Sequence, residues 1–194
     1  DRFHPWVFSG ALAEPLPDGL EEGDTVTVET SNGRLVGVGH FQIGSIAVRI
    51  LDFAATEINA EFFRSRLLQA LRLRQALQLA RPDNNAYRLV HGEGDFLPGL
   101  VVDIYGPTAV LQAHSPGMHF ARQIIAEQLV ALPELGVRNV YYKSETTLPY
   151  KAHLDARNDY LIGSMETSVA TENSLQFNID WLRGQKTGFF LDQR

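Results

Sequence analysis

Residues 184–194, GQKTGFFLDQR, indicate how the whole chain is organised. Gly184 and Gly188 allow backbone conformations that other residues disfavour, as a tight connection between domains requires. The apolar run 189–191 is followed by residues typical of the first turn of a helix, and natural domains seldom end in this way. We therefore expect the chain to be part of a longer protein that continues into another domain.

The stretch just before it has the alternation of a strand. Residues 175–181, LQFNIDW, predict a strand of the preceding domain with Leu175, Phe177 and Ile179 on its inward face. Burying a leucine or aromatic side chain is worth roughly 1.5–3 kcal/mol. We therefore expect the apolar run 189–191 to pack against protein rather than to stand in water.

Three motifs, spread over the whole chain, carry a resemblance to a known family. They are GQKTGFFLDQR at 184–194, HPWVFSG at 4–10 and GEGDFLPGLVVD at 92–103. The first is quite specific, and together they resemble the large-subunit ribosomal RNA cytosine-C5 methyltransferases, which use S-adenosylmethionine and begin with a PUA domain. The resemblance implies an RNA-binding PUA domain, then a mixed α/β domain, then a Rossmann-like catalytic domain.

The fold class expected from this resemblance is α+β. It implies a PUA-like β pseudobarrel at 1–55, a helical linker at 56–85, a mixed α/β domain at 86–183, and the start of a truncated catalytic domain at 184–194. The Rossmann-like methyltransferase domain itself is expected to be absent from the chain. The 194 residues, 44% of them hydrophobic, suit one large or two small domains.

Composition limits the function further. The chain has no cysteine, so disulfides and thiolate metal sites are excluded, and neither a membrane-spanning run nor a signal peptide is found in the sequence. We expect a cytoplasmic location and no membrane partner. The net charge of −6 argues against broad electrostatic capture of nucleic acid. An RNA-binding role therefore requires a local basic patch, or a further domain that supplies one.

Short alternating segments predict an all-β first domain. Pro5 favours an extended lead-in or edge strand over residues 4–8, and Asn32-Gly33 is a strong hairpin signal. The predicted strands are Thr25–Glu29, Leu35–Phe41 and Ile46–Leu51. Several short strands with frequent turns are typical of a small barrel or sandwich.

The spacing of apolar residues then becomes that of a helix over residues 60–79. At about 100° per residue, Arg64 and Arg72 lie on a different side from Arg66 and Arg74. This divided arrangement favours a solvated helix between two domains over an RNA-binding stripe.

Strands, one helix and further strands describe the second domain. An amphipathic helix is predicted over 120–132, and a long loop over 143–159. The predicted strands are Tyr87–Val90, Leu100–Tyr105, Ala109–Ala113, Val137–Tyr142 and Tyr160–Ile162.

No group of residues in the sequence predicts catalysis. The glycines at 92, 94 and 99 do not match a dinucleotide-binding loop, and His114 and His119 are too irregularly spaced to be a reliable metal-ligand pair. We assign no metal site and no catalytic residue. Enzymes of the resembled family activate carbon 5 of cytosine by adding a thiolate to carbon 6, and the chain has no cysteine to do so.

The resemblance implies that residues 184–194 form one wall of a cofactor site, through Lys186, Thr187 and Gln193. The cofactor would be S-adenosylmethionine in the full-length protein, with none bound by this chain alone. A plain alternative is that these polar groups only cap a turn and a helix.

Ribosomal RNA is the expected partner. Stacking and phosphate contacts are expected from His4 and four arginines, Arg2, Arg34, Arg49 and Arg64. Trp6 and Phe8 are more typical of core or interface packing. The alternative is a stand-alone RNA- or protein-binding module without methyltransferase activity. A homodimer is a further expectation from the family.

Overall fold

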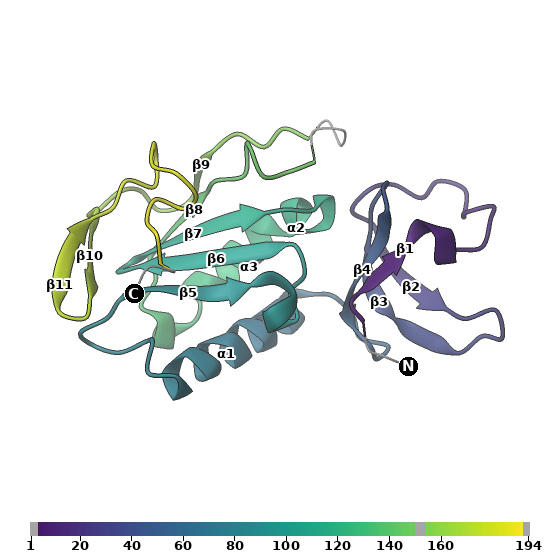
Figure 1. The fold of residues 1–194 in the computed structure, drawn as a ribbon, viewed down its shortest axis with the longest axis horizontal. Coiled ribbons are helices and arrows are strands. Elements are labelled where there is room, and N and C mark those ends of the chain that lie inside the picture. The colour runs from purple at the N-terminus through teal and green to yellow at the C-terminus, as the bar shows by residue number, and fades with distance from the viewer. Residues whose placement is uncertain (1–3, 150–153, 192–194) are drawn as a thin grey trace.

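The computed structural model describes residues 4–149 and 154–191. Its first part is a small all-β domain, and its second is a larger domain built on a mixed sheet (Figure 1). The chain passes from one to the other between strand β4 (Ile46–Asp52) and helix α1 (Ala60–Ala76). The expected mixture of strands and helices is therefore confirmed.

The first domain is a four-stranded antiparallel sheet in the order β1-β4-β3-β2, with a short 3-10 helix, η1 (Ser9–Ala11), after its first strand. Its core consists of Phe41, Val48 and Ile50, with partly buried neighbours. Gly33 has a φ of +77° between the second and third strands, the left-handed conformation that the Asn-Gly prediction requires. Besides β4, the strands are β1 (Trp6–Phe8), β2 (Thr25–Glu29) and β3 (Leu35–Phe41).

The second domain contains a five-stranded sheet in the order β5-β6-β7-β8-β9. Neighbouring strands are antiparallel except β7 and β8, which are parallel and joined by α2 (Pro116–Phe120), α3 (Arg122–Val130) and the 3-10 helix η3 (Pro133–Leu135). The 3-10 helix η2 (Gly92–Asp95) joins the first two strands. The strands are β5 (Ala86–His91), β6 (Leu100–Tyr105), β7 (Thr108–Ala113), β8 (Asn139–Tyr142) and β9 (Asp159–Ile162).

Helices α1 and α3 cover one face of this sheet (Figure 1). Phe63, Leu67 and Leu71 of α1 are buried with Ile125 and Leu129 of α3 in the main core. The expectation of a solvated helix between domains is therefore wrong. The arginines suggested exposure, but they lie beside an apolar stripe that packs on the sheet.

The predicted strand 175–181 is shorter than expected and belongs to a separate two-stranded sheet. Strand β11 (Leu175–Asn178) pairs with β10 (Val169–Glu172) in a hairpin beyond the main sheet. Leu175 is 64% exposed, which corrects its expected inward orientation, whereas Ile179 and Trp181 are buried. The hairpin ends at Asn178 because the chain there turns to pack on the main sheet.

The apolar run 189–191 follows that turn. Phe189 and Leu191 pack against a second core that contains Tyr105, Tyr141 and Trp181. Phe190 is 42% exposed, with the Lys186 ammonium 4.8 Å from its ring centroid. The expectation that this run packs against protein is confirmed for two of its three residues.

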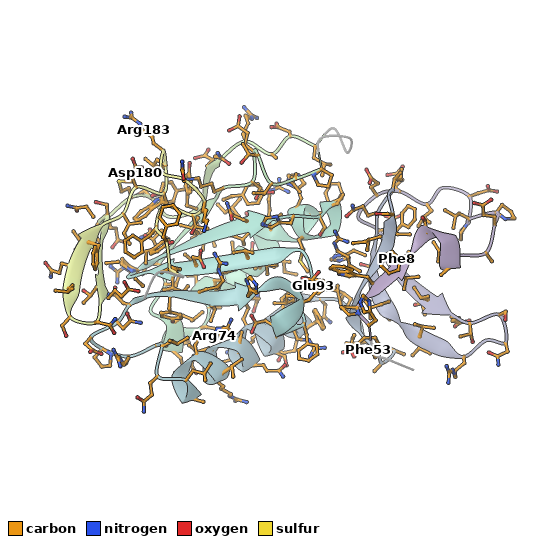
Figure 2. All side chains as sticks on the ribbon, viewed as in Figure 1. Phe8, Phe53, Arg74, Glu93, Asp180 and Arg183 are labelled. Carbon is orange, nitrogen blue, oxygen red and sulfur yellow. The ribbon has the colours of Figure 1, made fainter. Side chains whose placement is uncertain are left out.

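Side-chain hydrogen bonds join the two domains. Trp6 Nε1 of β1 donates to Glu93 Oε1 of η2 at 2.7 Å, and Figure 2 shows Glu93 at the border between the domains. Arg66 of α1 donates to the Asp52 carboxylate at the end of β4. Within the described part of the chain, no helix has the length and apolar character needed to cross a membrane.

Candidate functional site

The second face of the five-stranded sheet carries the candidate site. Successive side chains of a strand point to opposite faces. Leu89, Val102, Leu111 and Tyr142 therefore enter the helix-covered core, while their neighbours along each strand point to the other face. Val90 is the exception, because an irregularity in the register of β5 also places it in that core. The second face receives Arg88, Asp103 and Tyr105 near the C-terminal segment, and a row that runs across four strands through His91, Val101, Gln112 and Lys143.

The strand register explains that row. His91 pairs with Val101, and Val101 pairs with Gln112. Leu111 of β7 pairs with Tyr142 of the parallel strand β8. The residues that follow them, Gln112 and Lys143, therefore lie side by side. One histidine, one amide and one lysine, distant in sequence, are thus placed together by pairing alone.

A cleft of about 810 Å³ opens over this face. Its residues include two lysines, an arginine and two histidines, but no aspartate or glutamate among those that the structure describes. The lining residues are Arg88, His91, Val101, Gln112, His114, Lys143, Thr146, Thr147, Asn158, Gly184, Gln185, Lys186, Phe189 and Leu191. This lining is basic, although the chain as a whole carries a charge of −6.

The segment 184–191 forms one wall of the cleft. In Figure 2, Asp180 and Arg183 mark the chain that leads into it, above the sheet. Lys143 Nζ donates to the Gly184 carbonyl at 2.5 Å, and Gln112 Nε2 donates to the Lys186 carbonyl at 3.5 Å. Burial lowers the pKa of Lys143, and the negative charge of Asp180 opposes that shift.

A buried polar network anchors the same segment from below. Asp103 is fully buried and accepts hydrogen bonds from Arg88 Nε at 2.8 Å, Arg88 Nη2 at 2.9 Å and Thr187 Oγ1 at 2.5 Å. The Tyr105 hydroxyl lies 2.8 Å from Thr187 Oγ1. Burial, followed by the charge of Asp103, raises the pKa of Tyr105, so the phenol stays protonated. The network fixes both Arg88 and Thr187 in place.

A smaller hollow of about 260 Å³ adjoins the cleft at the border with the first domain. The two share His91, Val101 and His114. Arg49 of β4 lines the hollow, and its Nε and Nη1 are buried without a hydrogen-bond partner within the described structure. Burial lowers the pKa of Arg49, and Glu93 opposes the shift.

His114, one of the two histidines shared by both spaces, lies near two arginines and one glutamate. Burial lowers the pKa of His114, and the charges of Arg88 and Arg49 lower it further, while Glu93 opposes them. His114 is therefore neutral near pH 7 and available as a polar contact without charge.

The structure brings only some of the predicted residues to this site. Lys186 lines the cleft and Arg49 lines the adjoining hollow, whereas Arg34 and Arg64 line neither. Arg64 instead donates to the Ala131 carbonyl at 3.4 Å, after helix α3. Arg34 is exposed at the turn before β3.

The remaining predicted residues lie elsewhere. The exposed His4 accepts a hydrogen bond at Nδ1 from the Trp6 backbone at 3.1 Å. Thr187 is fully buried, and its hydroxyl is engaged with Asp103 and Tyr105. Its cofactor role stays a prediction, but its contacts here are those of an anchor. Arg2 and Gln193 lie outside the described residues.

Sequence reasoning missed Arg88, His91, Gln112 and Lys143 as site residues. Arg88 and Gln112 lie within predicted strands and Lys143 directly follows one, so strand alternation could have suggested them. His91 reaches the same face only through the register irregularity between Arg88 and Val90, which alternation does not predict. His119, in contrast, lies near Tyr142, with its Nδ1 2.7 Å from the phenol oxygen. No group of metal-ligating side chains is found among the residues described by the structure.

The comparisons with known proteins agree with this architecture. Residues 1–53 match the family described as PUA-like domain. All of the chain aligns with proteins named Ribosomal RNA large subunit methyltransferase I, at 35% identity for Aliivibrio fischeri (strain ATCC 700601 / ES114), 33% for Vibrio cholerae O395 and 34% for Yersinia pestis Angola. These alignments cover 49%, 48% and 49% of the relatives, so the chain spans about half their length.

Solved structures share the fold. A protein from Streptococcus mutans, described as a candidate SAM-dependent methyltransferase, matches with a TM-score of 0.72 at 18% identity, over 91% of this chain and 44% of that one. A candidate methyltransferase complexed with SAH matches with a TM-score of 0.72 at 18% identity, over 90% and 44%. The chain thus matches a PUA-like domain over residues 1–53 and is similar, over its whole length, to about half the length of proteins named Ribosomal RNA large subunit methyltransferase I.

Proposed function

We propose that this chain is the RNA-recognition and scaffold portion of an S-adenosylmethionine-dependent 23S ribosomal RNA cytosine-C5 methyltransferase. The observation that carries the proposal is the 35% identity, over all of the chain, to a protein named Ribosomal RNA large subunit methyltransferase I. The PUA-like match at residues 1–53 supports a role in RNA binding. A cytoplasmic location and ribosomal RNA as the partner are part of the proposal.

The chain is not catalytic by itself in this proposal. Carbon 5 of cytosine is a poor nucleophile, and a thiolate that adds to carbon 6 would activate it. The sequence has no cysteine to form that bond. The described sheet also has a single parallel strand pair, β7 and β8, unlike the mostly parallel sheet of a Rossmann-like domain. The chemistry is therefore assigned to a further domain of a longer protein.

The described residues do not fit S-adenosylmethionine on their own. The cofactor carries a sulfonium and an ammonium besides its carboxylate, and the described lining of the cleft offers cations for the carboxylate but no carboxylate for the two positive groups. Like charges at close range oppose binding. Thr187, a predicted contact, is fully buried and hydrogen-bonded below the cleft surface. We therefore expect no tight cofactor binding by this chain alone, and Lys186 remains a predicted contact in the longer protein.

The basic cleft supports the RNA part of the proposal. The acidic net charge requires a local basic patch for RNA binding, and the cleft is such a patch. Arg49 extends it to the border of the PUA-like domain.

A chimera tests the proposed function. The matching segment of the Aliivibrio fischeri relative is replaced by this chain, and the chimera is incubated with 23S ribosomal RNA and methyl-labelled S-adenosylmethionine. We expect 5-methylcytosine, detected by nuclease digestion and mass spectrometry, and no methyl transfer by the chain alone. A folded chimera that binds the RNA but forms no 5-methylcytosine contradicts the proposal and favours a stand-alone binding module. Methyl transfer by the chain alone also contradicts it.

A further inference from the structure

The charge and apolar surface of the cleft over the second face of the five-stranded sheet indicate which kind of ligand binds there. We propose that it receives a single-stranded RNA segment, with phosphates at Lys143, Lys186 and Arg88, and that the strand continues past His91 and His114 to Arg49. This inference rests on the proposed function, which it deepens by naming the substrate form and its path.

The charge of the lining is the first argument. Cations and histidines line the cleft without any carboxylate among its described residues, in a chain whose net charge is −6. Asp103 offsets part of the charge of Arg88 from below, but it is fully buried and does not line the cleft. The ligand therefore meets donors and positive charge, as a phosphodiester backbone requires.

The second argument is that the key donor is held rigidly. Asp103 binds Arg88 through Nε and Nη2, and Arg88 Nη1 lies 3.3 Å from His91 Nδ1. A bidentate pair fixes the plane of the guanidinium, so its orientation toward the cleft does not depend on the ligand. A fixed donor lowers the entropic cost of binding.

The third argument is the apolar part of the lining. Val101, Phe189 and Leu191 line the cleft beside the cations, and the exposed Phe190 lies next to the Lys186 ammonium. Apolar and aromatic surface next to cations suits bases together with their phosphates, because bases stack on aromatic rings. Inorganic phosphate alone would leave this surface unused.

The size and continuity of the space are the fourth argument. A volume of about 810 Å³ lies within the range of small-ligand pockets, which suits a short part of a single strand better than the wider body of a duplex. The adjoining hollow shares His91 and His114 with the cleft and ends at Arg49, two of whose nitrogens are buried without a partner within the described structure. A strand leaving the cleft thus passes Arg49 at the border of the PUA-like domain, where Glu93 also lines the hollow and offsets part of the arginine's charge.

Fluorescence anisotropy with a labelled single-stranded 12-nucleotide RNA tests the inference on the whole chain. The double variant Lys143→Gln/Lys186→Gln removes two cations of the cleft. The matched control, Arg72→Gln/Arg138→Gln, makes the same charge change at exposed positions that line neither space. Far-ultraviolet circular dichroism and thermal unfolding check that each variant is folded.

We expect the cleft variant to raise the Kd at least tenfold and the control less than twofold. The log–log salt slope should fall by roughly 0.7 for each phosphate that the variant no longer binds. Should the double variant fail to fold, the single variants Lys186→Gln and Arg49→Gln should each raise the Kd at least threefold. A duplex of the same sequence should bind at least tenfold more weakly than the single strand.

Equal Kd values for the cleft variant and the chain overturn the inference, as do an equal rise of the Kd in the control, preference for the duplex, or no RNA binding at all. None of these results decides the proposed function, which is tested separately by 5-methylcytosine formation in the chimera. A chimera that is inactive while the cleft variants bind RNA more weakly overturns the proposed function alone.

Discussion

The hydroxyl of Thr187 donates a hydrogen bond of 2.5 Å to the carboxylate of Asp103, and both residues are fully buried. They are 84 positions apart in the chain. This bond joins the wall of the cleft to strand β6, whose carboxylate also holds Arg88. The shape of the cleft and the orientation of its arginine therefore depend on one buried acid.

Thr187→Val tests that dependence. Valine keeps the shape of threonine but leaves Asp103 without one hydrogen bond, so we expect the free energy of unfolding to fall by about 1–3 kcal/mol. Thr187→Ser should restore much of it. Thr27→Val, at an exposed position of β2, is the control and should change it by about 0.5 kcal/mol or less. Urea unfolding measures all three, and an unchanged midpoint for Thr187→Val would show that the bond contributes nothing.

Gly117→Ala tests the border between the domains. An alanine Cβ there would lie 2.2 Å from the ring of His40, whereas alanine ordinarily stabilises a helix relative to glycine by roughly 0.5–1 kcal/mol. We expect the clash to reverse that sign and to cost about 1–3 kcal/mol. Gly94→Ala, where a Cβ would meet nothing within 4 Å, is the control. If calorimetry finds Gly117→Ala as stable as the parent, the close packing of His40 on α2 is wrong.

His40 also predicts a dependence of stability on pH. Burial lowers its pKa from 6.5 to about 4. Above pH 6.5 the imidazole is neutral in both states, but between 6.5 and 4 only the unfolded chain takes up the proton. The free energy of unfolding therefore falls as the pH falls through this window, by at most about 3 kcal/mol from this residue.

His40→Gln removes the contribution of this imidazole, so the free energy of unfolding should vary less with pH. His119, whose pKa burial likewise lowers to about 4, titrates in both proteins, so the difference between them isolates His40. Unfolding at about pH 7.5 and about pH 4.5 measures the effect. Parallel pH profiles for the two proteins would contradict it.

The sequence predicted most strands correctly because their alternation is local. Thr25–Glu29, Leu35–Phe41 and Leu100–Tyr105 were each predicted with the bounds that the structure shows. The environment of α1 could not be predicted in the same way. Arg74 indicated exposure, but its partner Asp95 is 21 residues away, and such pairing is a tertiary property.

The candidate site was less predictable than the fold. Arg88, Gln112 and Lys143 come from different strands, and only the register brings them together. The alternation assigns them to one face of the sheet. It does not reveal that the C-terminal segment covers only part of that face and leaves a cleft.

The buried pair of Arg74 and Asp95 gives a further prediction. Arg74 Nη2 donates to Asp95 Oδ2 at 2.8 Å, and both side chains are less than 10% exposed. Asp95→Asn leaves a buried guanidinium without its counter-charge, so we expect a loss of about 3–5 kcal/mol. Asp155→Asn, which breaks the exposed pair with Arg157, should leave the free energy of unfolding nearly unchanged, because solvent screens that pair. Similar losses for both variants, measured by denaturant unfolding, would contradict the distinction.

The most direct test of the central claim is photocrosslinking to a single-stranded RNA that contains 4-thiouridine, followed by mass spectrometry of the crosslinked peptides. The claim predicts crosslinks in peptides that contain Lys143, residues 184–191 and His114, which surround the cleft. Crosslinks confined to α1 and α3, which cover the opposite face of the sheet, would contradict it.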